Sequence, residues 1–259
     1  MIASLTCKLS DMKNYIYAAV AAIAALTSCQ VEELSEGVHE DVSTSGAEFY
    51  AVIETDEATR TVMDDNNNVL WSADDQVVIF AKNTLPARYQ IRSEYVGENY
   101  GYFSEVTSGG NSGDFGSSMS IDHNVAYYPY ADGIKCLKSG SGYALDVVLP
   151  SEQTYASESF GSGSFPMVAV SEDVNLTFRN VCGGVMLQLR GNCKVASVSI
   201  EGKNKEKLSG KASVTAYPDG SNPVIAMSDD ASASVTLDCG EGVQLNADNA
   251  VEFIISLPP

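Results

Sequence analysis

The sequence predicts an all-β protein built of β-sandwiches, and three observations lead to that prediction. Short apolar or alternating runs recur about every ten residues and are separated by turn residues, a spacing typical of sandwiches. The chain holds 21 Gly and 13 Tyr residues, which suits a loop-rich β protein better than a helical one. It contains no heptad pattern and no apolar run of about 18 residues, so neither a coiled coil nor a membrane-spanning helix is predicted.

The alternating and apolar runs place the individual strands. We expect strands at residues 49–54, 76–80, 87–91, 100–106, 143–149, 167–170, 208–216, 224–227, 234–237 and 250–257. At the centre of the chain, residues 176–200 carry two alternating runs around Gly191-Asn192, and such a two-residue break is a β-hairpin signal. In that hairpin Val185 would face Val198 on a buried side, while the other side meets water.

The start of the chain indicates export. Residues 15–26, YIYAAVAAIAAL, are too few to span a bilayer but suit the apolar part of a secretory signal peptide. The run ends in LTSC, residues 26–29, which resembles a bacterial lipobox in which the Cys is lipidated and becomes the new N-terminus. We predict a signal peptide over residues 1–28, with Met12 as the natural start, and lipidation at Cys29. An ordinary signal peptide with a chance Cys is the alternative.

Residues 29–46 are polar, acidic and Ser-rich without periodicity, and they are predicted to form an acidic tether. The acidic residues of 30–33 resemble the surface-export signal of lipoproteins in some anaerobic Gram-negative bacteria, with a plain acidic linker as the alternative. At the other end, residues 251–257 read as a good strand and the chain stops at Pro259. The last part of the chain then holds about five strands.

Charge and side-chain chemistry exclude several function classes. The chain carries 34 acidic and 15 basic residues, a net charge of −19, which repels nucleic acid, so no nucleic-acid partner is predicted. The two histidines, His39 and His123, have no partners at metal spacing, and no common catalytic motif occurs. We therefore predict no enzyme, no catalytic residue, no cofactor and no metal. The many tyrosines could stack on sugar rings, although core packing is the favoured role for at least half of them.

An ordered set of motifs carries a family resemblance. In chain order these are Thr59-Arg60-Thr61, Trp71 with Asp74-Asp75 and an apolar strand, AYYPY at 126–130, LPSEQ at 149–153, PMVA at 166–169, and EKLSG at 206–210. Together with the lipobox they resemble the fimbrillin family of bacterial surface lipoproteins, over about residues 29–259. The resemblance implies two β-sandwich domains of transthyretin-like topology, which we place at residues 47–171 and 172–259. In that family further strands normally follow a segment like 251–257, so the resemblance implies that the second sandwich is incomplete, from a fragment or a truncated gene, with an exposed edge and core.

The resemblance also implies a function. We expect a fimbrillin-like lipoprotein on the cell surface, lipid-anchored in the outer membrane. It would be a structural or adhesive subunit, or the anchor, of a fimbria or pilus, with other fimbrial subunits or itself as partners. A surface lipoprotein that binds a glycan or a host ligand without polymerising is the alternative.

Arg60 is the first site that a trypsin-like protease could use after Cys29, because no Lys or Arg lies between them. Cleavage there would give a new terminus at Thr61 and release the lipid, the tether and the strand at 49–54. The groove left behind could accept a strand from a neighbouring subunit by β-strand addition, which is how related fimbrial subunits are understood to polymerise. The simpler interpretation, a solvated Arg at a strand edge, is preferred because exposed Arg is common.

Four cysteines remain besides Cys7 and the lipobox residue, and they allow three pairings. They are Cys136, Cys182, Cys193 and Cys239. In the predicted hairpin, Cys182 and Cys193 lie roughly 27 Å apart, far beyond disulfide reach. We therefore predict that these two are not bridged, and we favour free, mostly buried thiols.

Overall fold

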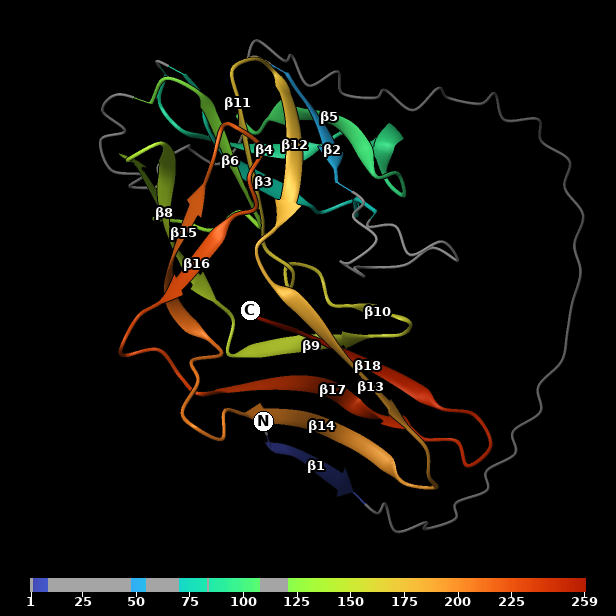
Figure 1. The fold of residues 1–259 in the computed structure, drawn as a ribbon. Helices are drawn as coiled ribbons and strands as arrows, with labels where there is room; N and C mark the ends of the chain where they lie inside the picture. The colour runs from blue at the N-terminus through green and yellow to red at the C-terminus, as the bar shows by residue number, and fades with distance from the viewer. Residues whose placement is uncertain (1, 9–47, 55–69, 83, 108–120) are drawn as a thin grey trace, which may run out of the picture.

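The structure is a computed structural model, and it describes residues 2–8, 48–54, 70–82, 84–107 and 121–259, with only the backbone for residues 2–8. These residues are nearly all β, as predicted, with one short 3-10 helix, η1 (Ser93–Tyr95). The strands are β1 (Ile2–Lys8), β2 (Phe49–Ile53), β3 (Gln76–Phe80), β4 (Ala87–Ile91), β5 (Tyr100–Glu105), β6 (Asn124–Tyr128), β7 (Lys135–Ser139), β8 (Gly142–Leu149), β9 (Glu152–Ala156), β10 (Ser159–Phe160), β11 (Met167–Ser171), β12 (Asn175–Asn180), β13 (Gly183–Leu189), β14 (Lys194–Glu201), β15 (Gly210–Ala216), β16 (Val224–Met227), β17 (Ser234–Gln244) and β18 (Val251–Leu257). They are arranged in layered sheets (Figure 1).

Seven strands form a closed sheet in the order β11-β12-β2-β5-β4-β3-β6, which occupies the upper part of Figure 1. Alternation along each strand turns every second side chain inward. Its core therefore collects large apolar side chains, among them Phe49, Trp71, Phe103 and Phe178, each at most 2% exposed. Closure leaves no unpaired strand within this sheet.

A four-stranded sheet, β16-β15-β8-β7, packs against the outside of β3, β6 and β11. Val78 and Tyr127 of the closed sheet meet Leu145 and Val214 of this sheet in a second apolar core. β3 and β6 are thereby covered on both faces, which explains why their sequences, QVVIF and NVAYY, do not alternate between apolar and polar residues.

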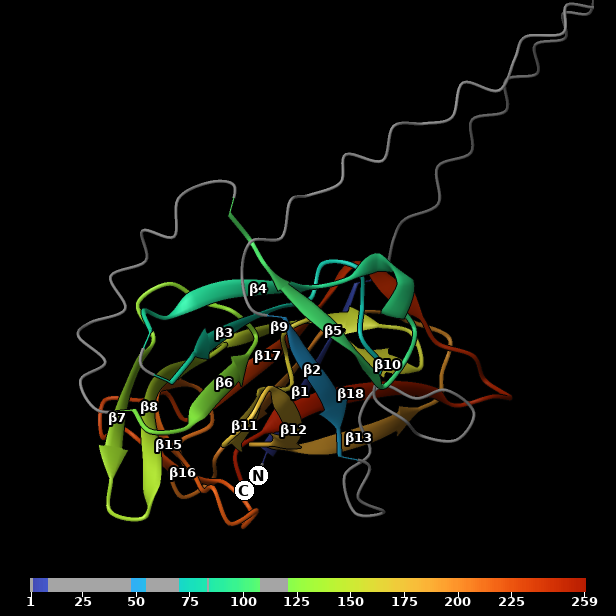
Figure 2. The ribbon, with the colours of Figure 1, turned by 90° about the horizontal axis from the view of Figure 1, so that it is seen from above.

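The third layer combines a five-stranded sheet, β1-β14-β17-β9-β10, with the pair β13-β18 (Figures 1 and 2). Val198 and Leu237 from the larger sheet face Phe253 and Ile255 from the pair across a third apolar core. This face-to-face packing of two sheets is a sandwich. At the outer edge of the larger sheet, β1 runs antiparallel to β14 from Ile2 opposite Glu201.

The predicted hairpin around Gly191-Asn192 is wrong. β13 pairs with β18, so Val185 lies opposite Ile255, whereas β14 pairs with β17 and Val198 lies opposite Leu237. The two alternating runs do share one buried side, but they meet across the core of the sandwich instead of side by side in one sheet. Alternation fixes which side chains point inward and leaves the pairing partner open.

Strand pairing crosses the predicted domain boundary between residues 171 and 172. β12 lies in the closed sheet, parallel to β2. β8 pairs with β15, and β9 runs parallel to β17. That position therefore does not separate two hydrogen-bonded units.

The bonding states of the cysteines confirm the prediction in part. Cys136, Cys182 and Cys239 are free and buried, so Cys182 and Cys193 are not bridged, as predicted. Cys193, which we also expected to be free, is disulfide-bonded, and its bridge is not to any of these three. The spacing of cysteines along a chain does not determine their connectivity, which explains the error.

Most of the predicted export signal, with Met12, Cys29 and the tether, lies outside the described residues, and of residues 1–28 only β1 is described. Within the part that the structure describes, no helix is long and apolar enough to cross a membrane.

Candidate functional site

The strand β2 and the aromatic side chains beneath it form the candidate site. β2 alternates strictly: Phe49, Ala51 and Ile53 point inward and are at most 2% exposed, while the residues between them are partly exposed. It lies between β12, to which it is parallel, and β5, to which it is antiparallel. One short strand from the N-terminal side of the chain thus completes the closed sheet.

Backbone hydrogen bonds hold β2 at both ends. The Tyr50 amide donates to the Val174 carbonyl at 2.9 Å, and the Glu54 amide donates to the Phe178 carbonyl at 2.9 Å. The Glu54 carboxylate also pairs with the Arg179 guanidinium at 2.5 Å. Removal of β2 would leave the Val174 and Phe178 carbonyls and the Arg179 guanidinium without these partners, along an edge that another extended segment could fill.

Trp71 forms the centre of the aromatic floor beneath β2. Its ring meets Phe103 at 4.9 Å and Phe178 at 5.5 Å between centroids, both edge to face, which is a favourable geometry. Phe49 adds an edge-to-face contact with Tyr89 at 5.2 Å. The Trp71 Nε1 donor is buried and has no hydrogen-bond partner in the described part of the chain.

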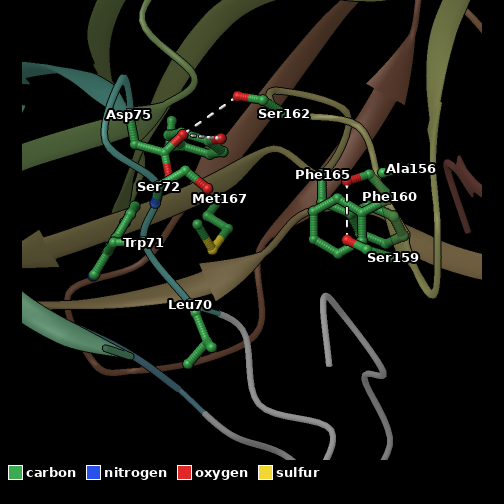
Figure 3. A pocket seen from close by; sticks show the side chains of 11 residues that line it. Leu70, Trp71, Ser72, Asp75, Ala156, Ser159, Phe160, Ser162, Phe165 and Met167 are labelled. Atoms are coloured by element: carbon green, nitrogen blue, oxygen red, sulfur yellow. Dashed lines mark hydrogen bonds between the residues drawn. The ribbon is translucent and has the colours of Figure 1, made fainter. Parts of the chain in front are cut away.

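A pocket of about 280 Å³ opens beside Trp71 (Figure 3). One wall is the Leu70–Asp75 segment, and the other is the β9–β10 hairpin with the segment that follows it. Figure 3 shows Phe160 of β10 and Phe165 of that following segment side by side. The lining is mostly apolar with a few polar groups, a composition typical of small-ligand pockets.

Asp75 is the charged group of this pocket. The Ser72 amide donates to its Oδ2 at 2.7 Å and the Tyr128 hydroxyl donates to its Oδ1 at 2.7 Å, with Ser162 Oγ at 3.4 Å. Burial raises the pKa of Asp75, although these hydrogen bonds oppose the rise. Burial and the neighbouring Asp75 charge raise the pKa of Tyr128, which keeps its hydroxyl protonated as a donor. Such an arrangement can hold a ligand in the pocket by hydrogen bonding.

A second polar cluster surrounds Asp122, at the start of β6. Lys138 Nζ lies 2.6 Å from its carboxylate, and the Tyr143 hydroxyl donates to the same carboxylate. Lys138 first, then Tyr143 and His123, lower the pKa of Asp122. His123 also lies 3.7 Å from Glu172. Among the described residues, no group of three or more His, Cys, Asp or Glu side chains could hold a metal ion.

The predicted site residues fall outside the described ranges. Cys29, Arg60 and Thr61 are not among the described residues. The described chain leaves the closed sheet at Glu54 and resumes at Leu70, so the segment that contains Arg60 joins β2 to the wall of the pocket.

Sequence reasoning missed the pocket because it missed the hairpin that forms one wall. The sequence predicts no strand between residues 149 and 167, whereas Glu152–Ala156 is strand β9. The buried Gln153 is the feature that distinguishes β9 as a strand packed against the rest of the protein. Its side chain both donates to and accepts from the Ser256 backbone at 2.9 Å, which ties β9 to β18.

In comparisons with family models, curated proteins and solved structures, none matches this chain.

Proposed function

We propose that the chain is a fimbrillin-like cell-surface lipoprotein, anchored in the outer membrane through Cys29. It acts as a structural or adhesive subunit, or as the anchor, of a fimbria, and it assembles with itself or with other fimbrial subunits by β-strand addition. The observation that supports this proposal is the position of β2. A short strand, linked onward through the segment that holds Arg60, completes a closed sheet over an aromatic floor.

Cleavage after Arg60 would cut the covalent link between β2 and the rest of the closed sheet. β2 would then be held by non-covalent contacts: its two ladders, the flanking Glu54–Arg179 ion pair and its three inward side chains, Phe49, Ala51 and Ile53. Burial of a large apolar side chain contributes about 1.5–3 kcal/mol, so a strand with similar inward residues could replace β2 with little net cost. Exchange of one strand for another is the chemistry of β-strand addition.

The edge at β14 supports the same assembly mode. Residues 2–8 come from the far end of the chain, yet they pair along the outer side of β14 through seven residue pairs. Removal of the predicted signal peptide would take residues 2–8 from the mature lipoprotein, so this edge of β14 would be open to pairing with an extended segment of another subunit.

N-terminal sequencing of protein sheared from the cell surface tests the proposal. We expect a new terminus at Thr61 in polymerised material, and polymers on electron micrographs. Arg60→Ala should retain the lipidated Cys29 and lose the polymers, whereas the control Lys82→Ala, an exposed basic residue elsewhere, should process normally. Sheared material that always begins at lipidated Cys29 would instead identify an anchor or a free-standing lipoprotein.

The lipid anchor has its own test. Each buried CH₂ of an acyl chain contributes about 0.8 kcal/mol, and several chains give near-permanent attachment. Cys29→Ala should therefore move the protein from the membrane fraction to soluble or unprocessed pools. Unchanged membrane association, with no lipid label on the wild type, would refute the anchor.

The second candidate is a surface lipoprotein that binds a glycan or host ligand without polymerising. The pocket beside Trp71 favours it, since a mostly apolar lining with a few converging polar groups suits a bound ligand. Glycan-array binding by a monomer, without polymers, would support this candidate over the first.

A further inference from the structure

Three tyrosines point outward from the closed sheet, and a fourth, Tyr95, lies beside them while its partly buried side chain also packs against the core of that sheet. We call them the tyrosine face: Tyr50 of β2, Tyr95 of η1, and Tyr100 and Tyr102 of β5. Tyr50 lies directly opposite Tyr102 in the β2–β5 ladder, and alternation turns both rings outward, away from the core that Phe49 and Phe103 fill.

The rings form one continuous aromatic surface. Tyr50 lies 5.1 Å from Tyr102 and 6.4 Å from Tyr100 between ring centroids. Tyr95 closes the group at 5.7 Å from Tyr102 and 6.1 Å from Tyr100. Tyr100 is 39% exposed and Tyr102 is 37% exposed, so ring surface remains open to solvent.

A glycine lets Tyr95 reach this surface. A Cβ atom on Gly101 would lie 2.6 Å from the Tyr95 Cβ and 2.6 Å from Ile91 Cδ1, closer than real atoms approach. Any other residue at this position would push η1 away from β5. The close approach of the two elements is what places Tyr95 beside Tyr100 and Tyr102.

Planar polar side chains border the tyrosine face on both sides. On one side, Arg92 pairs with Glu48 at 3.1 Å and with Glu94 at 2.6 Å. On the other side, Asn175 lies opposite Tyr50, and Glu54 pairs with Arg179 farther along β12. Each of these three border carboxylates is paired with an arginine and offers hydrogen-bonding groups, and because Arg92 serves both Glu48 and Glu94 the border carries a slight excess of negative charge.

We propose that the tyrosine face binds a neutral oligosaccharide. The C–H face of a pyranose ring stacks on exposed aromatic rings, and its hydroxyls both donate and accept hydrogen bonds, which suits amide, guanidinium and carboxylate groups at the border. The net charge of −19 disfavours anionic chains, which selects neutral sugars. The inference rests on the ligand-binding candidate above and not on polymerisation.

Calorimetric titration of the full chain carrying Cys29→Ala tests the proposal, with neutral gluco-, manno-, galacto- and xylo-hexasaccharides as probes. We expect binding of at least one probe. The double variant Tyr100→Ala/Tyr102→Ala should weaken it about tenfold or more, because two stacking rings are lost. Tyr100→Phe/Tyr102→Phe keeps the rings and should retain most of the affinity. Val148→Ala, exposed on another sheet, should change nothing.

Three outcomes would overturn the proposal. The first is no binding of any neutral probe by a chain that unfolds cooperatively at the wild-type temperature. The second is equal affinity in the Ala and Phe double variants, or a preference for sulfated or sialylated chains. The third is self-association without sugar that the Ala variant abolishes, which would make the face a contact between copies. Polymerisation after Arg60 cleavage is measured separately, so failure here leaves that proposal untouched.

Discussion

Among single residues, the buried Asp75 has an environment that couples folding to pH. It is 5% exposed, and burial raises its pKa in the folded state. Between the ordinary carboxyl pKa and the raised value, the folded protein keeps a proton that the unfolded chain releases. The stability contributed by neutral Asp75 is therefore fully present at low pH and is lost as pH rises through this window.

Asp75→Asn removes the titrating group and tests this coupling. We expect the wild-type free energy of unfolding, minus that of the variant, to fall as pH rises above about 4 and then to level off. Urea denaturation at a series of pH values measures the difference, and the subtraction cancels the titration of the other carboxylates. A difference that rises with pH would mean that the folded pKa of Asp75 is depressed.

The free cysteines are residues whose chemistry is suppressed by packing. Burial raises the pKa of Cys136 and Cys182 to about 12, and that of Cys239 to about 11. Since the thiolate is the nucleophile, we expect none of the three to react with iodoacetamide at about pH 8 in the folded protein. All three should react in guanidinium. Peptide mass mapping measures both, and rapid labelling of folded protein would contradict the burial.

At the scale of elements, β2 shows how one strand can stabilise a whole sheet. Phe49→Ala should lower the free energy of unfolding by about 3–5 kcal/mol, because it leaves a cavity among aromatic rings that cannot collapse easily. Val52→Ala, on the outward side of the same strand, is the matched control and should cost much less. Urea denaturation measures both, and equal losses would show that β2 does not cover the core.

The β9–β10 hairpin depends on close approach at Gly161. A Cβ atom there would lie 2.3 Å from the Thr154 carbonyl oxygen. We expect Gly161→Ala to displace the hairpin wall of the pocket and to cost about 1–3 kcal/mol, as overpacking does. Gly183→Ala is the control, since its Cβ would meet nothing within 4 Å. Thermal unfolding compares the two variants, and similar midpoints would contradict the clash.

At the scale of the whole molecule, the sheets connect segments that are distant in the chain. The β8–β15 pairing and the β2–β12 pairing both join the two predicted domains, 47–171 and 172–259. We therefore expect residues 47–171, expressed alone, to lack cooperative thermal unfolding and to expose the edge of β8 that pairs with β15. Circular dichroism and amide chemical-shift dispersion test this against the full chain. Cooperative unfolding of the fragment would show that it folds without its partner strands.

The sequence by itself determined the fold class and most strand positions. Alternation and apolar runs predicted β3, β4 and β16 with the bounds that the structure has, because these signals depend only on neighbouring residues. It missed β1, β7, β9 and the two-residue β10, and it treated β12 and β13 as one run. β7 is mostly exposed and β10 is too short to show a period. Alternation also correctly indicated that Val185 and Val198 point to one core.

Tertiary structure decided which strand pairs with which, and therefore where the candidate sites lie. Val185 could pair equally well with Val198 or with Ile255, since every apolar alternating strand offers the same ladder of donors and acceptors. The pocket exists only because β9 and β10 fold against the Trp71–Asp75 segment. Tyr95 joins the tyrosine face because Gly101 has no side chain and lets η1 lie close to β5. Contacts between distant segments depend on packing of the whole chain, which local sequence patterns do not contain.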